Sequence, residues 1–397
     1  CPNLGRIAAG ATTVRSELPE LSPVNWTSFF TGEGPEVHGV YGFTAIDPVT
    51  YTLSLASSES VRCPTIFDRL GEAGLVSKVV NLPNTYPAKP LRGMMISGFV
   101  AERLDRAVYP PFLGAALSDY LLEADTTRGA ADPAYLLSGL RRTLASRGRA
   151  LNLLWPDLEW DLFTFVLTET DRLFHFFHPA VSDPAHPLHA DMLALLREWD
   201  GLIGEILARY DALAHPKRLL VLADHGFTDL KTEVDLNAFL RKRGNLHLDG
   251  LSTDEWDATH IAPRTTAFAL DPGRIHLHTR DIFPRATLSR PEAGPLLPGL
   301  MDALTSLTWR GERVMKRVLL AEELYGPNRA PGAPDLVCEP NPGFDLKAKF
   351  NREEVFGLFG RFGTHTPDGA IFSDSEGARP ERLRDVGRII MEHFQVN

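Results

Sequence analysis

Short apolar runs alternate with helical patterns along much of the chain. Leu75–Val80, Leu162–Leu167 and Leu219–Leu222 are mostly apolar runs of strand length, and they predict buried β-strands. Pro64–Ala73 and Met192–Leu213 have helical patterns, and in the second segment apolar residues recur at steps of three and four. This alternation predicts an α/β fold in which a mostly parallel central sheet is covered by helices on both faces.

Two long stretches have a less regular pattern. Residues 84–135 are rich in turn-forming residues, with Pro and Gly concentrated in Thr85–Val100, and we expect them to form loops that decorate the sheet. From Glu233 to Phe350 the pattern is also mixed. A strand is predicted there at Ala267–Leu270 and a helix around Pro298–Leu307.

The length of 397 residues fits two or three domains of average size, or one large domain with insertions. Because no internal repeat or long linker interrupts the chain, we predict a single α/β domain over residues 1–397, with insertions roughly at 44–150 and 235–350. The composition, 44% hydrophobic and 23% charged, is that of an ordinary globular protein. A folded chain of this length buries about 75% of its extended surface, so it needs no disulfide or metal merely to fold.

Charge and hydropathy exclude several classes of partner. The 41 Lys and Arg residues against 51 Asp and Glu give a net charge of −10, which argues against binding to a nucleic-acid polymer or an anionic membrane surface. No run of about 18 apolar residues is present, so we expect no membrane span. The oligomeric state is left open by the sequence.

The cysteines and the first residues bear on location. Cys1, Cys63 and Cys338 lie far apart and form no CxxC pair, which suits a reducing compartment and makes the cytoplasm the preferred location. The opening residues, CPNLGRIAAG, have the character of a domain interior and lack the basic and apolar regions of a signal peptide. We therefore expect a leading segment upstream of Cys1.

A candidate chemical site follows the predicted strand Leu219–Leu222. Asp224-His225-Gly226 stands at the carboxyl end of that strand, where catalytic groups gather in open parallel sheets. Both side chains are metal-ligand types, and Gly226 permits a sharp bend that brings them to one cation. The alternative is that Asp224 caps a following helix while His225 packs in the core.

Two further motifs contain histidine. In Asp171-Arg-Leu-Phe-His175 the four-residue spacing places Asp171 and His175 on one face of a helix, where they can share a metal ion. Such pairs are also common on solvated helices. His365 lies in GTHTPDG, a Gly- and Pro-containing loop in which a histidine is normally just exposed. Each motif alone is weak.

A hydroxyl stands at an expected helix start. Ser22 directly precedes Pro23, which is favoured at the first helical position, in the segment LSPVNWTSFFTG. The amides and dipole at a helix N-terminus attract an anion. The alternative is that Ser22 is an ordinary N-cap. If a hydroxyl of this segment acts as a nucleophile, Ser22 is the first choice, and Thr27 and Ser28 are the second-choice nucleophiles.

Taken together, the motifs indicate more than each does alone. Asp and His without Cys suit zinc or manganese, and two such clusters suit a two-metal site. The order of these motifs along the chain resembles that of the type I phosphodiesterase/nucleotide pyrophosphatase family of the alkaline phosphatase superfamily. The motifs are, in order, LSPVNWTSFFTG with GPEVHG, then TETDRLFH, ADHGF and GTHTPDG. NLPNTYP at Asn81–Pro87 and the Asp235-Leu236-Asn237 segment add to the resemblance, which runs from residue 2 to about residue 375.

The resemblance implies an alkaline-phosphatase-like three-layer α/β/α fold and a metal-dependent phosphoester hydrolase. The positions that match the family's site form a ligand triad, a ligand pair and a nucleophile: Asp171, His175 and His365; Asp224 and His225; and Ser22. Two divalent ions, zinc before manganese, are implied as cofactors. Ser22 would attack a small-molecule phosphoester as the nucleophile and form a phosphoseryl intermediate that water then releases.

The sequence departs from the family in two places. The resemblance implies one more Asp ligand, at the end of the family's first strand, and we expect this position upstream of Cys1, so that residues 1–397 would hold only part of the second metal site. Nucleotide pyrophosphatases carry an Asn after the His-Gly pair that contacts a phosphate oxygen, and Phe43 stands at the matching position here. Asn25 and Tyr86 are the substrate-binding candidates, although Asn25 could equally cap or pack.

Two alternatives to a phosphodiesterase stay open. The first is another reaction on the same scaffold: a phosphomonoesterase, a phosphonate hydrolase, a phosphomutase or a sulfatase. A sulfatase is disfavoured because SPVNW, which starts at Ser22, lacks the Arg of the C/S-x-P-x-R motif. The second is a non-catalytic binding protein, against which the intact Asp and His motifs argue.

Overall fold

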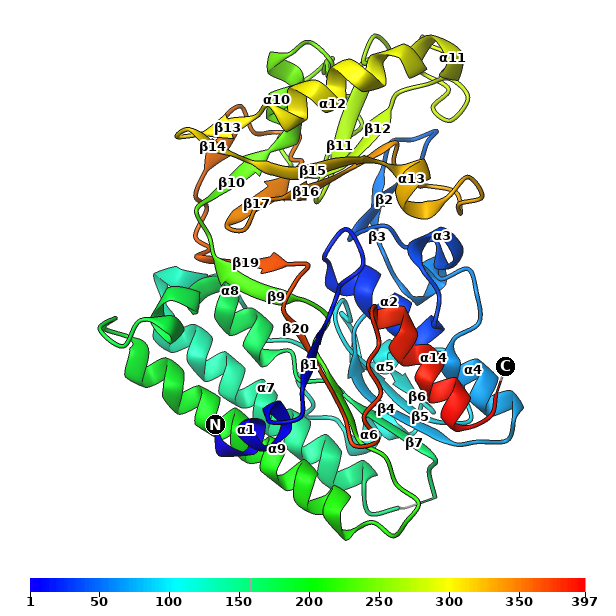
Figure 1. The fold of residues 1–397 in the computed structure, drawn as a ribbon, viewed down its shortest axis with the longest axis vertical. Helices are drawn as coiled ribbons and strands as arrows, with labels where there is room; N and C mark the ends of the chain where they lie inside the picture. The colour runs from blue at the N-terminus through cyan, green and yellow to red at the C-terminus, as the bar shows by residue number, and fades with distance from the viewer. Residues whose placement is uncertain (158, 397) are drawn as a thin grey trace. The chain divides into compact units, whose positions relative to one another are not determined.

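The computed structural model describes residues 1–157 and 159–396, which form two compact units (Figure 1). Unit 1 comprises Cys1–Glu33, Ser57–Asp229 and the chain from Gly360 on, and unit 2 comprises Gly34–Ala56 and Leu230–Phe359. The predicted insertion at 235–350 falls within unit 2, whereas the one at 44–150 is divided between the two units. The number of independently folding domains stays a prediction.

Unit 1 contains the longest helices and the strands that pair in parallel. Its helices are α1 (Pro2–Ala8), α2 (Ser22–Thr31), α4 (Ile66–Glu72), α5 (Leu104–Ala107), α6 (Leu113–Ala116), α7 (Pro133–Leu154), α8 (Glu169–Ser182), α9 (His189–Ala212) and α14 (Leu383–His393). Its strands are β1 (Thr12–Val14), β4 (Ser77–Leu82), β5 (Gly93–Ser97), β6 (Val108–Tyr109), β7 (Leu162–Phe165), β8 (Leu220–Leu222), β9 (Gly226–Asp229), β19 (Gly363–Thr366) and β20 (Ala370–Asp374).

Unit 1 has helices on both sides of its main sheet. Strand β4 pairs in parallel with β5 on one side and β7 on the other, and β6 adds an antiparallel edge. Val79 and Leu82 of β4 face a core shared with α2, α4 and α14, whereas Val80 of β4 faces a core shared with α7. Successive residues of β4, Val79 and Val80, thus face opposite sides of the sheet, which confirms the predicted three-layer α/β/α arrangement.

A second sheet of unit 1, β1-β20-β8, is antiparallel throughout. Its residues Val14 of β1 and Phe372 of β20 join the same core as α2 and α14. Strand β8 ends at Leu222, two residues before Asp224. The Asp224-His225 pair therefore follows a strand end, as expected, but the sheet is antiparallel and not the parallel sheet that the argument assumed.

The sequence prediction for residues 84–135 needs correction. The loops expected there contain β5, which lies inside Thr85–Val100 and pairs in parallel with β4, and the long helix α7 begins at Pro133. The flanking Pro and Gly residues suggested loop, but Met95 and Ile96 are buried in two different cores, as strand residues are. Burial in a sheet outweighed the local turn propensity.

Unit 2 is built mainly from antiparallel strands with short helices. Its helices are α3 (Pro35–His38), α10 (Leu236–Lys242), α11 (Arg290–Ala293), α12 (Leu297–Thr305) and α13 (Ala321–Tyr325). Its strands are β2 (Thr44–Ile46), β3 (Leu53–Leu55), β10 (Thr232–Asp235), β11 (Ala267–Leu270), β12 (Arg274–Leu277), β13 (Thr308–Trp309), β14 (Glu312–Arg313), β15 (Met315–Leu320), β16 (Leu336–Pro340), β17 (Phe344–Lys347) and β18 (Phe356–Gly357).

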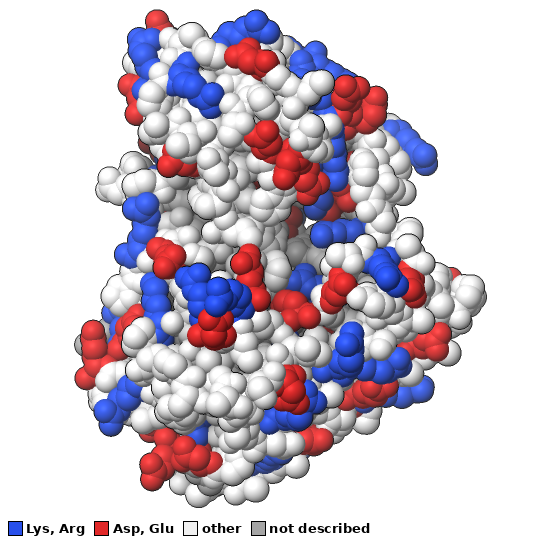
Figure 2. Space-filling model, turned by 180° about the vertical axis from the view of Figure 1, so that it is seen from behind, with Lys and Arg blue, Asp and Glu red and all other residues white. Residues whose placement is uncertain are grey.

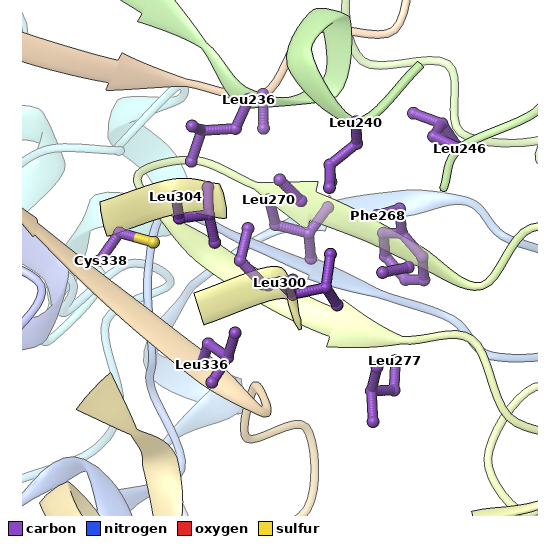
Figure 3. Close-up of a cluster of buried hydrophobic side chains, with 14 of the residues drawn as sticks. Leu236, Leu240, Leu246, Phe268, Leu270, Leu277, Leu300, Leu304, Leu336 and Cys338 are labelled. Atoms are coloured by element: carbon purple, nitrogen blue, oxygen red, sulfur yellow. The ribbon is translucent and has the colours of Figure 1, made fainter. Parts of the chain in front are cut away.

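The core of unit 2 lies between its helices and the sheet β11-β12-β16-β15. Figure 3 shows leucines of α10 and α12 gathered around Phe268 and Leu270 of β11. The Asp235-Leu236-Asn237 segment ties α10 to this sheet. The Asp235 carboxylate accepts a hydrogen bond from the Ala238 amide, and the Asn237 side chain exchanges two hydrogen bonds with the backbone of Ala269. This part of the motif therefore has a structural role in unit 2.

A buried histidine of unit 2 predicts a specific dependence of stability on pH. The His276 ring stacks on Phe268 with 5.4 Å between ring centroids, and burial lowers its pKa to about 3. Below pH 6.5 the unfolded chain therefore binds a proton at His276 that the folded chain does not, and stability falls as the pH falls. Between pH 6.5 and pH 5 this costs about 2 kcal/mol of unfolding free energy.

We expect His276→Leu to remove this part of the pH dependence. Urea titrations of the wild type and the variant at pH 7 and pH 5 measure it, with the exposed His393→Gln as the matched control. A loss of stability between the two pH values that is as large in His276→Leu as in the wild type contradicts the prediction.

The surface and the helices bear on partners. On the face shown in Figure 2, Lys and Arg side chains are intermingled with Asp and Glu side chains. None of the described helices is both long and apolar enough to cross a bilayer. The expectation that the protein binds no nucleic-acid polymer and no anionic membrane surface stays a prediction.

Candidate metal centre

Three elements of unit 1 carry the histidine and aspartate residues singled out in the sequence. Helix α8 holds Asp171 and His175 one turn apart, as the spacing predicted. The turn between β8 and β9 holds Asp224 and His225. Strand β19 holds His365, which was expected in an exposed loop and instead pairs with Phe227 of β9.

Two glycines let these elements approach closely. A Cβ atom at Gly363 would lie 2.2 Å from the Phe174 carbonyl oxygen of α8, so only glycine allows β19 to lie this close to the helix. A Cβ atom at Gly226 would lie 2.3 Å from the Asp368 carbonyl oxygen. The glycines of the GTH and DHG motifs are therefore required by close packing around the histidines.

Asp171, His175 and His365 converge on one point. The Nε2 atom of His365 lies 3.0 Å from Nε2 of His175 and 3.2 Å from Oδ2 of Asp171. The third distance, from His175 Nε2 to Asp171 Oδ2, is 3.6 Å. The three donor atoms lie within 4.8 Å of one another, close enough to bind one ion.

The second group adjoins the first. His225 Nε2 lies 3.3 Å from Asp224 Oδ2, 3.3 Å from the Ser22 hydroxyl and 3.9 Å from Asp171 Oδ2. The His225 ring also stacks on the His365 ring, with 3.6 Å between centroids. The structure therefore brings together all six residues that the sequence placed in the metal and nucleophile positions.

Main-chain carbonyls fix the tautomer of each imidazole. Nδ1 of His175 lies 3.3 Å from the Gly363 oxygen, Nδ1 of His225 lies 3.1 Å from the Gly226 oxygen, and Nδ1 of His365 lies 3.1 Å from the Glu20 oxygen. A carbonyl oxygen only accepts, so each Nδ1 carries the proton and donates it. The Nε2 lone pairs are left facing the shared centre, as in metal-binding histidines.

Burial sets the charges of the cluster. It lowers the pKa of His175 well below the ordinary value, and it also lowers the pKa of His225. Both rings are therefore neutral at pH 7. Burial opposes ionisation of Asp171, but the groups around it, among them the Arg172 guanidinium, hold its pKa well below the usual range. The cluster thus offers neutral imidazoles beside a carboxylate.

This donor set fits divalent cations. Two unprotonated nitrogens that face each other at 3.0 Å repel unless a cation lies between them. Oδ2 of Asp224 is buried and has no hydrogen-bond partner among the described residues, which also suits a ligand atom. Nitrogen and carboxylate donors without thiolates suit zinc or manganese.

The Ser22 hydroxyl lies 3.3 Å from His225 Nε2 of this cluster. Helix α2 begins at Ser22 itself, with Leu21 at the N-cap, so Ser22 lies in the first turn and does not precede the helix as expected. The hydroxyl of Thr27, a second-choice nucleophile, donates to the Pro23 oxygen and accepts from the Asn84 amide. The Thr27 hydroxyl is thus engaged in local hydrogen bonds, and the role of Ser22 as nucleophile stays a prediction.

The two substrate-binding candidates, Asn25 and Tyr86, also belong to unit 1. The Asn25 side chain is buried and accepts from the Glu17 amide while donating to the Leu21 oxygen, so its amide holds the start of α2. Tyr86 is buried, and the Arg106 guanidinium lies over its ring. A substrate contact by either residue stays a prediction. Phe43 belongs to unit 2.

Sequence reasoning missed Arg172. Its guanidinium donates to Oδ1 of Asp171 at 3.1 Å and lies 3.4 Å from Glu123, which leaves Oδ2 of Asp171 for the imidazoles. The residue follows Asp171 directly in TETDR, but spacing alone does not show that it turns back onto its neighbour. Such a charge partner of a ligand orients the carboxylate.

Comparison with known proteins identifies the family of this chain. A family model described as type I phosphodiesterase / nucleotide pyrophosphatase matches residues 1–368. The chain belongs to this family. It is therefore a phosphoester hydrolase of the alkaline phosphatase superfamily, as the sequence motifs implied. No curated protein matches the sequence.

Solved structures of the superfamily share the fold. Phosphonoacetate hydrolase from Sinorhizobium meliloti 1021 in complex with phosphonoformate matches with a TM-score of 0.64 at 17% identity, over 98% of this chain and 89% of that chain. Murine ectonucleotide pyrophosphatase/phosphodiesterase 5 gives 0.55 at 15%, over 100% and 90%. Wild-type alkaline phosphatase PafA gives 0.61 at 14%, over 99% and 91%. These likenesses confirm the alkaline-phosphatase-like fold.

Proposed function

We propose that this family member hydrolyses small-molecule phosphodiesters, with Ser22 as the nucleophile and two divalent cations as cofactors. The observation that carries the proposal is the convergence of three Nε2 lone pairs with Asp171 Oδ2, next to the Ser22 hydroxyl. Zinc is the first choice of cation and manganese the second. The phosphodiesterase assignment is supported by the family match over residues 1–368.

Two groups of residues would hold the cations. Asp171, His175 and His365 would hold one ion, and Asp224 and His225 the other, with the Ser22 hydroxyl beside the second group. Bound divalent cations would withdraw charge from the phosphoryl oxygens and lower the pKa of a neighbouring hydroxyl. A further carboxylate ligand for the second ion is expected from the family.

The chain's own groups perform the bond changes. Oγ of Ser22, after losing its proton to solvent, would attack phosphorus in line with the leaving oxygen, so that an Oγ–P bond forms while the P–O bond to the leaving group breaks and the leaving oxygen takes a proton from water. Water would then break the Oγ–P bond and restore the Ser22 hydroxyl. The first turn of α2 directs its amide dipole at the negative charge that develops at Ser22. Arg172 keeps one oxygen of Asp171 turned toward the imidazoles.

A substrate panel tests the assignment. The full-length protein, loaded with zinc and separately with manganese, is assayed with a p-nitrophenyl phosphomonoester, a phosphodiester, a phosphonate ester and a sulfate ester. We expect the largest kcat/KM for the diester. A monoester, phosphonate or sulfate ester turned over more than about tenfold faster overturns the diester preference. No turnover together with no bound metal favours a non-catalytic binding protein.

Location and assembly have less support. The three cysteines are free in the structure, in keeping with the cytoplasmic location predicted from the sequence, which stays a prediction. The proposed partner is a small-molecule phosphoester. The structure describes one chain, so the oligomeric state is not part of the proposal.

A further inference from the structure

One aromatic ring of unit 1 contacts all three imidazoles of the metal centre. Phe227 of β9 stands directly opposite His365 of β19 in the antiparallel pair, so both side chains lie on the same face. The centroid of its ring lies 5.1 Å from that of His365, 5.0 Å from that of His175 and 5.7 Å from that of His225. Phe227 therefore contacts imidazoles from both proposed ligand groups.

The angles between these rings restrict how the imidazoles can turn. The Phe227 ring makes an interplanar angle of 75° with both His175 and His365, an edge-on arrangement that aromatic rings prefer. A single Nδ1 hydrogen bond leaves an imidazole free to swing about that bond. Contact with a fixed ring removes this freedom, because rotation would drive the imidazole into Phe227 or open a gap beside it.

We propose that Phe227 is a positioning residue for the metal ligands. Its ring holds His175, His225 and His365 in the planes in which their Nε2 atoms converge, while the carbonyl partners fix the tautomers. The proposal rests on the proposed function, since it takes these Nε2 atoms as ligands. It adds a residue that binds neither cation nor substrate and acts through the imidazoles.

Phe174 of α8 offers a matched control. Its ring lies 5.5 Å from Phe227 and 5.6 Å from His178, and both phenylalanines belong to the same aromatic group. Among the described ring contacts of Phe174, none is with the three imidazoles of the centre. Removing Phe174 thus deletes a comparable ring without removing a contact to the ligands.

The experiment measures zinc affinity of the metal-free, full-length protein by competition with a chelating dye. The variants are Phe227→Ala, Phe227→Leu, Phe227→Tyr and Phe174→Ala, and the thermal unfolding of each metal-free variant is recorded beside its affinity. We expect Phe227→Ala to weaken zinc binding about 10- to 100-fold, the range found when residues that orient metal ligands are removed. Phe227→Tyr keeps the ring and is expected to stay within about threefold of wild type, as is Phe174→Ala.

The outcomes separate this inference from the proposed function. Equal losses of affinity in Phe227→Ala and Phe174→Ala, or no loss in Phe227→Ala, overturn the positioning role. If Phe227→Ala does not fold, Phe227→Leu replaces it: weak binding by Leu with normal binding by Tyr supports the role, and equal binding by both overturns it. If the wild-type protein binds no zinc or manganese, the proposed function itself fails, and this inference fails with it.

Discussion

Replacing Ser22 with Ala is expected to lower kcat of the full-length, metal-loaded protein by about 10³-fold or more, because the reaction loses its nucleophile while the rest of the site remains. Ser22 Oγ is the hydroxyl found 3.3 Å from His225 Nε2, and alanine removes only that atom from the first turn of α2. Initial rates on the best substrate of the panel measure the effect. The metal content of each protein is measured beside the rates, because a loss of bound metal would by itself lower kcat.

Two further variants control this result. Ser22→Thr keeps a hydroxyl at the same position and is expected to retain far more turnover than Ser22→Ala. Thr27→Val tests the second-choice hydroxyl, which hydrogen-bonds to Pro23 and Asn84, and is expected to change stability more than rate. A Ser22→Ala protein that keeps more than a few per cent of wild-type turnover rejects Ser22 as the nucleophile.

The second large effect is expected from Asp171→Asn. The change keeps the shape of the side chain and removes its charge, at the one carboxylate whose Oδ2 lies within 3.9 Å of the Nε2 atoms of His175, His225 and His365. We expect metal affinity to fall at least about 100-fold, because the substitution changes a metal ligand itself. Mutation of a residue that only hydrogen-bonds to a ligand already lowers metal affinity about 10- to 100-fold. Turnover is expected to fall with it at limiting zinc.

Elemental analysis after dialysis against buffered zinc, together with the zinc dependence of kcat, measures this loss. Asp229→Asn is the matched control, because Asp229 pairs with His178 at the exposed end of β9 and lies outside the metal centre. A variant at position 171 that holds as much metal as wild type under the same conditions contradicts the assignment of the triad.

The parts of the site predicted from sequence are those that depend on local geometry. Helical spacing places Asp171 and His175 together because residues four apart lie on one face. The apolar run Leu219–Leu222 located Asp224 and His225 directly after a strand, and β8 is that strand, although it lies in an antiparallel sheet and not in the parallel sheet expected. The resemblance to the family added His365 and Ser22, whose own sequence neighbourhoods are weak signals.

Other parts of the site leave no sequence signal. The oxygens of Glu20, Gly226 and Gly363 that fix the three tautomers are main-chain atoms, and any residue at those positions carries one. Two of them come from segments remote in sequence from the histidine they hold. Their placement depends on how the chain folds back, which spacing cannot reveal.

The fold was predicted least well where the conformation favoured by the local sequence differs from the one imposed by pairing with a distant strand. Strand β5 lies in a Pro- and Gly-rich stretch, and it is a strand because it pairs with β4 and buries residues on both faces. His365 lies in a segment with turn-forming residues, and it is held in β19 by pairing with β9. In both cases a tertiary partner decides the structure. Strands and helices with strong apolar patterns, such as β11 and α9, occur close to where they were predicted.

The stereochemical course at phosphorus tests the central claim most directly. The full-length protein hydrolyses a phosphorothioate diester that is chiral at phosphorus, in isotopically labelled water, and ³¹P NMR reports the configuration of the product. Two successive in-line displacements, the first by Ser22 and the second by water, predict net retention. Net inversion would mean that water attacks the substrate in a single step, and it would contradict a covalent intermediate on Ser22.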